Sequence, residues 1–145
     1  MITIKKRYDN LPFAHRQPNH KGHCSLIHGH NWSFEFEFGA TELDKNGFVV
    51  DFGNIKWLSV WLANQFDHTL VLNEDDPVFR YLNDALMLNR QLANIVTVPN
   101  CGAEGLASYV FEEVNDMLAD IYDHRVHLVA VTVYEDTKNS ATFRA

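Results

Sequence analysis

The sequence predicts an α+β fold in which helices cover one face of an antiparallel sheet. In the segment 32–38, Trp and Phe alternate strictly with Ser and Glu, which is typical of a half-buried strand. The segments 53–66, 76–92 and 103–122 each carry apolar residues at helical spacing. The apolar stretch 126–135 indicates a long buried strand. Strands coupled by a turn and followed by helices favour the α+β class.

The N-terminal third is predicted to consist of strands. Ile2 to Tyr8 alternates loosely and predicts a strand, and an irregular histidine-rich segment, His15 to His23, follows it. After the strand at 32–38, Asp44-Lys45-Asn46-Gly47 predicts a tight turn, because Asn-Gly tolerates the positive φ angles of hairpins. We expect Phe48 to Asp51 to return as the second strand of this hairpin.

The remaining elements are expected to be three helices and three strands. Asn54 is a candidate N-cap for the first helix. Asp76-Pro77 starts the second helix, with proline at its first position, and its apolar stripe is expected to cover core. Ile95 to Val98 predicts a short strand, and Ser140 to Arg144 predicts a last edge strand.

Length and composition indicate one folded domain, residues 1–145. A chain that is 46% hydrophobic and 12% aromatic is not intrinsically disordered. Its two cysteines, Cys24 and Cys101, are too few for a disulfide scaffold, which favours a reduced, cytoplasmic protein. We therefore expect a core large enough to position a site.

The net charge of the chain argues against nucleic acids and membrane surfaces as partners. At a formal charge of -7 the chain lacks the excess of basic residues that nucleic-acid and membrane-surface binders use. No apolar run approaches the ~18 residues needed to span a bilayer, and the first ten residues do not read as a signal peptide. A small molecule is the expected partner.

Histidines near residue 30 predict a metal site. Residues two apart in an extended chain point to the same face, so His28 and His30 can reach one ion. His15 is the nearest upstream candidate for a third ligand, with His20 and His23 as competitors. Three histidines and an open position are typical of catalytic zinc. The spacing alone equally allows exposed histidines at a strand end.

Acid–base candidates lie on both sides of this motif. Cys24 could be a thiolate base, a fourth zinc ligand or a buried apolar residue. Asp67-His68 follows the first helix, where a carboxylate that orients an imidazole would make a general acid–base pair.

An ordered set of motifs resembles the 6-pyruvoyl-tetrahydropterin synthase/6-carboxy-tetrahydropterin synthase family. The matching pieces are Phe13-Ala14-His15, Cys24-Ser25-Leu26-Ile27-His28-Gly29-His30-Asn31, Gly47 to Phe52, Phe66-Asp67-His68 through Leu72-Asn73, and the glutamates Glu104 and Glu135. Each piece alone is weak, whereas the set in this order is specific and spans most of the chain.

The resemblance implies a particular fold and assembly. It implies the tunnelling fold, a four-stranded antiparallel sheet with helices on one face. Three subunits would join their sheets into a barrel, and two trimers would stack into a hexamer. It also implies Zn²⁺ held by His15, His28 and His30.

The same resemblance implies an activity and its residues. Cys24 would be the catalytic base, with Asp67 and His68 completing the proton-transfer set, in some relatives across a subunit interface. Glu135 would anchor the pterin ring, whose edge offers a ring N–H beside an amino group, and Glu104 would also contact substrate. The substrate would be dihydroneopterin triphosphate, converted to 6-carboxy-tetrahydropterin of the queuosine (deazaguanine) pathway or to the 6-pyruvoyl product.

One departure keeps two other functions open. Relatives carry Pro-Thr where this chain has Cys101-Gly102, which puts the substrate in question. A non-catalytic or diverged pterin- or purine-binding protein of the same fold is the first alternative. An unrelated zinc hydrolase, with Glu104 activating water, is the second.

Overall fold

The structure is a computed structural model that describes residues 1–145. Its strands are β1 (Ile2–His15), β2 (His28–Ala40), β3 (Thr69–Asn73), β4 (Asn94–Val98), β5 (His127–Tyr134) and β6 (Ser140–Arg144). Its helices are α1 (Lys56–Phe66), α2 (Val78–Leu88) and α3 (Ala103–Tyr122), with short 3-10 helices at His23–Ser25 and Phe52–Ile55. The α+β class is confirmed.

All six strands form one mixed sheet in the order β4-β3-β1-β2-β5-β6. The expectation of a four-stranded antiparallel sheet is wrong in both number and direction. β1, β2, β5 and β6 are antiparallel neighbours, whereas β3 lies parallel to β1 and to β4. α2 connects β3 to β4, and strands joined by such a helical crossover run parallel.

A bulge in β1 sets which of its side chains face the helices. The pairing of β1 with β2 shifts between Tyr8 and Leu11, and Asn10 there has a φ of 60°. Tyr8 and Leu11 are three residues apart, yet Tyr8 donates to the Ile55 carbonyl and Leu11 is buried. The extra residue therefore brings Leu11, and with it Phe13 and His15, onto the core face.

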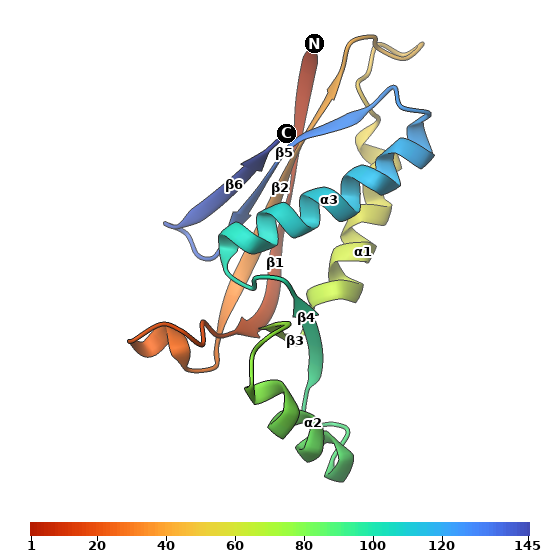
Figure 1. The fold of residues 1–145 in the computed structure, drawn as a ribbon. Coiled ribbons are helices and arrows are strands. Elements are labelled where there is room, and N and C mark those ends of the chain that lie inside the picture. Colours follow the sequence, from red (N-terminus) through yellow and green to blue (C-terminus); the bar gives the residue numbers. More distant parts are fainter.

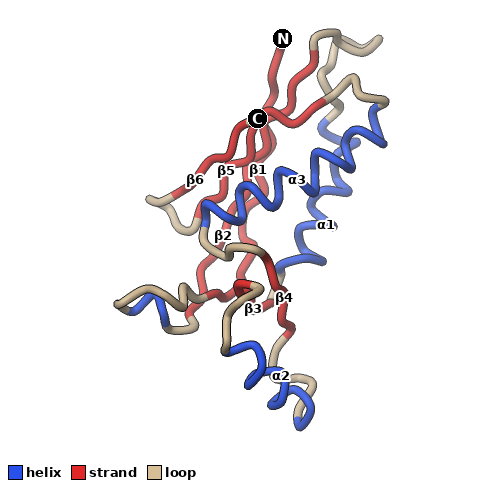
Figure 2. The backbone as a smooth tube through the Cα atoms, in the orientation of Figure 1, coloured by secondary structure: helices blue, strands red, loops and turns tan.

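α1 and α3 pack on one face of the sheet and leave the other face without a helix (Figures 1 and 2). The core between these layers contains Trp32, Phe34, Phe36 and Phe38 of β2, all fully buried as their alternation predicted. The uncovered face carries cross-strand ion pairs, such as Lys5–Glu35 and Arg144–Glu37. The sheet is thus apolar on one side and polar on the other.

The segment after β2 is a loop, so the predicted second strand at Phe48 to Asp51 is wrong. The turn itself is present, with Gly47 at a φ of 82°. The Asp44 carboxylate accepts hydrogen bonds from the backbone N–H groups of Asn46 and Phe48, which curls the chain back on itself. β2 already pairs with β1 and β5, so no sheet edge is left for a hairpin partner.

α1 is preceded by the short 3-10 helix Phe52–Ile55, and it is this helix that a side chain caps. The Asp51 carboxylate accepts a hydrogen bond from the Gly53 N–H, and Asn54 lies inside the short 3-10 helix instead of capping it. The apolar stripe of α1 is confirmed, because Leu58, Leu62 and Phe66 are all buried.

α2 projects from the end of the molecule beyond β3 and β4 (Figure 1). The expectation that its apolar stripe covers core is wrong, since none of its residues is buried. Met87 and Leu88 are 78% and 92% exposed. Periodicity predicted the helix, but it could not show that no other element lies against it.

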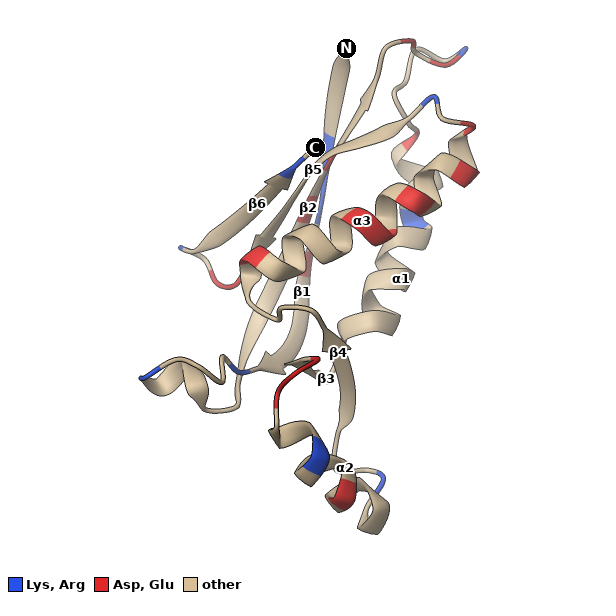
Figure 3. Cartoon of the chain, viewed as in Figure 1, with Lys and Arg blue, Asp and Glu red and all other residues tan.

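Charged residues are unevenly placed on the fold. Acidic residues recur along α3, whereas Lys and Arg are scattered over loops, strands, α1 and α2 (Figure 3). None of the three helices has the length and apolar character required to cross a membrane.

Candidate metal and catalytic site

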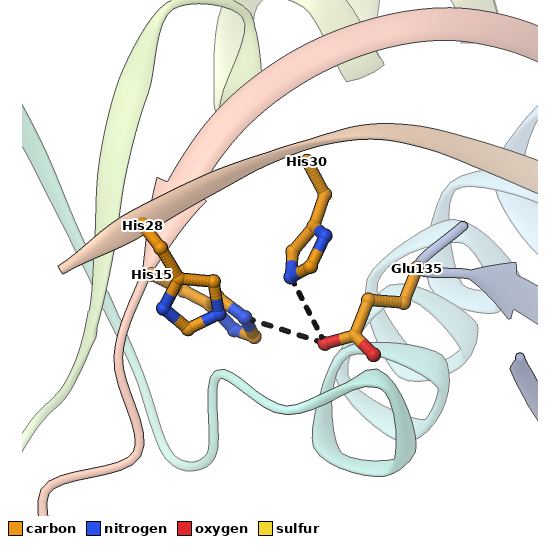
Figure 4. Close-up of side chains that lie close together, drawn as sticks. All are labelled: His15, His28, His30 and Glu135. Atoms are coloured by element: carbon orange, nitrogen blue, oxygen red, sulfur yellow. Dashed lines mark ion pairs between the residues drawn. The ribbon is translucent and has the colours of Figure 1, made fainter. Parts of the chain in front are cut away.

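Four side chains from three strands converge at one end of the core face. They are His15 of β1, His28 and His30 of β2, and Glu135 immediately after β5 (Figure 4). One nitrogen or oxygen atom of each lies within 4.8 Å of those of the other three. Pairing places His15 opposite His28 and Phe13 opposite His30. Sheet register thus gathers residues that are 120 positions apart in sequence.

Backbone carbonyls orient two of the imidazoles. The Nδ1 atom of His15 lies 2.8 Å from the Cys101 carbonyl oxygen, and that of His28 lies 2.6 Å from the Leu26 carbonyl oxygen. A carbonyl only accepts hydrogen bonds, so each Nδ1 carries the hydrogen and each Nε2 presents a lone pair. This is the arrangement that metal-binding histidines adopt.

The donor set fits a zinc ion. The Nε2 atoms of His15 and His30 are buried and have no hydrogen-bond partner. Burial lowers the pKa of His15, although the Cys101 carbonyl opposes this, so the neutral imidazole that a metal requires is favoured. Neutral imidazole nitrogens with a carboxylate oxygen are ligands that zinc binds well.

Aromatic side chains form the wall behind the histidines. Trp32 is fully buried, and its ring lies edge-on to both His15 and His30, with centroids 4.9 and 5.3 Å away. Phe13 stacks on the same indole at 4.5 Å, and the indole Nε1 donates to the Phe13 carbonyl. Because these rings are packed, the imidazoles have little freedom to rotate.

Contacts that the sequence did not predict connect His15 to the rest of the fold. The Asn73 side chain at the end of β3 accepts from the Cys101 N–H, and the Cys101 carbonyl contacts His15. Next to His15, the Arg16 guanidinium pairs at 2.8 Å with the buried carboxylate of Asp76, which also accepts from the N–H of Val78. No sequence pattern linked these residues to the histidines, because each contact joins distant segments.

The proposed proton-transfer residues lie outside the histidine cluster. Cys24 is half-buried in the short 3-10 helix His23–Ser25 and is a free thiol. The carboxylate of Asp67 lies 2.6 Å from Nδ1 of His68, so these two side chains do pair. Both are exposed, and His68 has a φ of 55°. Within one chain, Cys24, Asp67 and His68 take no part in the metal cluster.

The remaining candidates lie outside the histidine cluster. Glu104 is exposed in the first turn of α3. A Cβ atom at Gly102 would collide with the side-chain amide of Gln17, so glycine leaves the room that Gln17 fills. His20 and His23, the competing ligands, are exposed and lie outside the cluster.

The whole chain matches one family of known proteins. The family model described as 6-pyruvoyl tetrahydropterin synthase matches residues 3–145. The chain belongs to the 6-pyruvoyl tetrahydropterin synthase family. Membership covers every residue of the histidine cluster, including Glu135 at the far end of the sequence.

Curated relatives within this family are similar over part of their length. The 6-carboxy-5,6,7,8-tetrahydropterin synthase of Rickettsia typhi is 42% identical over 77 residues, which cover 52% of this chain and 55% of that protein. The protein of the same name from Aquifex aeolicus is 25% identical over 134 residues, covering 91% of this chain and 81% of the relative. The chain thus spans about half the length of the Rickettsia relative that it matches.

Solved structures share the fold. A crystal structure of an uncharacterised protein from Wolinella succinogenes superposes with a TM-score of 0.84 at 19% identity, covering 99% of this chain and 97% of that one. A 6-pyruvoyltetrahydropterin synthase of Plasmodium vivax superposes with a TM-score of 0.72 at 17% identity, over 100% and 99% of the two chains. These likenesses establish the curled mixed sheet and its helices as the family fold.

Proposed function

We propose that this protein is a zinc-dependent tetrahydropterin synthase that acts on dihydroneopterin triphosphate, with residues 1–145 as its single domain. The observation that carries the proposal is the convergence of His15, His28 and His30, two of whose Nε2 atoms are buried without a partner. The 6-carboxy product is favoured over the 6-pyruvoyl product, because the curated relatives described above are named for it.

The three histidines would hold the metal. When bound there, zinc supplies Lewis-acid chemistry that acidifies protons next to the oxygen atoms of the substrate side chain. The contribution of the chain is orientation: the Cys101 and Leu26 carbonyls fix the tautomers of two imidazoles, and Trp32 blocks rotation. Such supporting contacts raise metal affinity and activity.

Cys24, Asp67 and His68 would move the protons. Cys24 is four residues before His28 and would remove a proton from the substrate side chain as a thiolate. The Asp67 carboxylate orients the His68 ring through Nδ1, which leaves Nε2 free to give or take a second proton. The exposure of this pair, outside the cluster of its own chain, supports a site completed by a neighbouring subunit.

Glu135 and Glu104 would bind the substrate. A carboxylate can accept two parallel hydrogen bonds from the ring N–H and amino group on the pterin edge. Glu135 lies beside the histidines, so a ring that it binds would lie next to the metal site. Glu104 is exposed in the first turn of α3 and would contact a more exposed part of the substrate.

Product analysis tests this proposal directly. Zinc-loaded protein is incubated with dihydroneopterin triphosphate, and the pterin products are identified by mass spectrometry. We expect the 6-carboxy product from wild type, about one zinc per subunit, and neither from His28→Ala. His20→Ala is the matched control and should retain both, because His20 lies outside the cluster.

Two outcomes would contradict the proposal. Retention of zinc by His28→Ala would reject the metal site. Tight binding of the pterin by zinc-loaded wild type without turnover would instead support a pterin- or purine-binding protein of the same fold, an alternative favoured by Gly102 and the Gln17 side chain beside it.

A further inference from the structure

The carboxylate of Glu135 lies close to two histidine rings but forms no hydrogen bond with either. Its Oε1 atom lies 3.4 Å from Nε2 of His15 and 3.3 Å from Nε2 of His30 (Figure 4). Neither nitrogen has a hydrogen-bond partner, although both atoms are buried. The carboxylate therefore approaches both rings at an almost equal distance without hydrogen-bonding to either.

The orientation of His15 makes this contact unfavourable unless a cation is present. The His15 Nδ1 atom donates to the Cys101 carbonyl, so Nε2 carries a lone pair in the neutral ring. A carboxylate oxygen also presents lone pairs. Two acceptors that face each other repel, here a buried nitrogen and the oxygen of a partly exposed carboxylate, and a positive ion between them converts the repulsion into two favourable contacts.

The two distances from Oε1 of Glu135 match those between ligands of a tetrahedral zinc ion. Zinc binds histidine nitrogen and carboxylate oxygen at ~2.0–2.2 Å. The edge of a tetrahedron is about 1.63 times its centre-to-vertex length, which puts two such ligand atoms roughly 3.3–3.6 Å apart. The separations of Oε1 from His15 and His30 fall in this range. A hydrogen-bonded pair would be closer, at about 2.7–2.9 Å.

We propose that Glu135 is a fourth protein ligand of the metal when no substrate is bound. The inference rests on the proposed function for the metal itself and adds a ligand to the three histidines. Four protein ligands close a zinc site, whereas three leave the position that catalysis needs. Glu135 would then have to leave the metal before the substrate oxygens could reach it.

The same carboxylate has a reason to leave. Accepting two parallel hydrogen bonds from a pterin edge turns both oxygens toward the ring and draws electron density from Oε1, so ring binding competes with metal binding by the same carboxylate. Arrival of the ring would therefore open the coordination position next to the place where the substrate side chain lies. Glu135 would act first as a ligand and then as the ring anchor.

Metal binding without any substrate tests the inference. Purified full-length wild type, Glu135→Gln, Glu135→Ala and Glu112→Gln are titrated with Zn²⁺ against a competing chelator and, separately, loaded with Co²⁺. We expect both Glu135 variants to bind Zn²⁺ at least about tenfold more weakly. Their Co²⁺ visible absorption should shift in position and intensity, because a water molecule replaces the carboxylate as a ligand.

Glu112→Gln is the matched control, since it removes one negative charge from an exposed position on α3. It should leave the Zn²⁺ affinity and the Co²⁺ spectrum unchanged. Circular dichroism of each variant shows whether the fold is retained, and Glu135→Gln, with its near-identical shape, is decisive if the alanine variant unfolds.

Three outcomes would reject Glu135 as a metal ligand. Unchanged Zn²⁺ affinity and Co²⁺ spectra in the Glu135 variants, with metal lost from His28→Ala, would overturn the fourth ligand and leave the proposed function standing. Metal retained by His28→Ala would overturn the proposed site and the inference with it. An equal loss of affinity in Glu112→Gln would show a general charge effect and also reject the ligand role.

Discussion

The two cysteines differ in their surroundings more than in their sequence context. Cys101 is fully buried, and its thiol donates to the Arg16 carbonyl at 3.1 Å. Burial raises the pKa of the Cys101 thiol, which keeps it protonated at neutral pH. Cys24 is only half-buried in its short helix.

This contrast predicts selective alkylation. Brief treatment of the native protein with iodoacetamide at pH 7 should modify Cys24 and spare Cys101, because alkylation requires an accessible thiolate. Peptide mass spectrometry gives the modified fraction at each position. Denatured protein, in which both thiols should react, is the control, and faster labelling of Cys101 in the native protein would contradict the described packing.

Replacing Cys24 distinguishes its two possible roles, a general base and a zinc ligand. Cys24→Ala should retain zinc and fold, while turnover of dihydroneopterin triphosphate falls by at least ~10²-fold, the lower range for losing a general base. Metal analysis and product formation are measured on the same preparation. Loss of zinc would make Cys24 a ligand, and unchanged turnover would make it a packing residue.

Spacing in the sequence selects His28 and His30, leaves the three upstream histidines as alternatives for the third ligand, and does not describe the surroundings of any of them; the family resemblance is what singles out His15. His28 and His30 share a face because they are two residues apart in a strand, and this can be predicted locally. The direction of the Glu135 carboxylate depends on the register of β5 against β2. The Cys101 carbonyl beside His15 depends on where α3 starts in space, and neither is encoded by a motif.

At the scale of elements, periodicity predicts the secondary structure of a segment better than the elements that pack or pair with it. α3 was predicted at its observed bounds, because its apolar stripe is long and regular. β3 was missed, because five residues between a helix and a turn carry too little periodicity. The parallel direction of β3 and β4 follows from the connection through α2, which long-range topology determines.

The same leucine-to-alanine substitution in two helices tests whether α3 is packed against the core and α2 is not. Leu118 of α3 is fully buried, whereas Leu88 of α2 is 92% exposed. Leu118→Ala should lower the free energy of unfolding by about 2–5 kcal/mol, because it leaves a cavity. Leu88→Ala should change it by no more than about 0.5 kcal/mol. Urea denaturation measures both, and equal effects would show that α2 is covered in solution.

At the scale of the whole molecule, the sheet ends in two unpaired edges. β4 and β6 are the outermost strands, and each presents free N–H and C=O groups along one side. One face of the sheet also lacks a helix (Figure 2). Pairing between copies of the chain would satisfy these edges, which supports the proposed oligomer.

Light scattering tests this assembly. At micromolar concentration the protein should have a mass that is a multiple of 16.7 kDa, and three or six subunits are expected. His68→Ala and His28→Ala subunits are each inactive under the proposed mechanism, and mixing them should restore activity if one site draws residues from two subunits. A mass of 16.7 kDa alone would reject the assembly.

The position of Glu135 makes the metal and the pterin ring competitors for one carboxylate. Coupling between two ligands is reciprocal, so a ring that draws Glu135 away weakens zinc binding by the same factor by which zinc weakens ring binding. Under the proposed role of Glu135, the protein without a bound ring therefore holds its metal more tightly than the protein saturated with a bare ring. A chelator would therefore strip zinc faster from protein that is saturated with the bare ring than from protein without it.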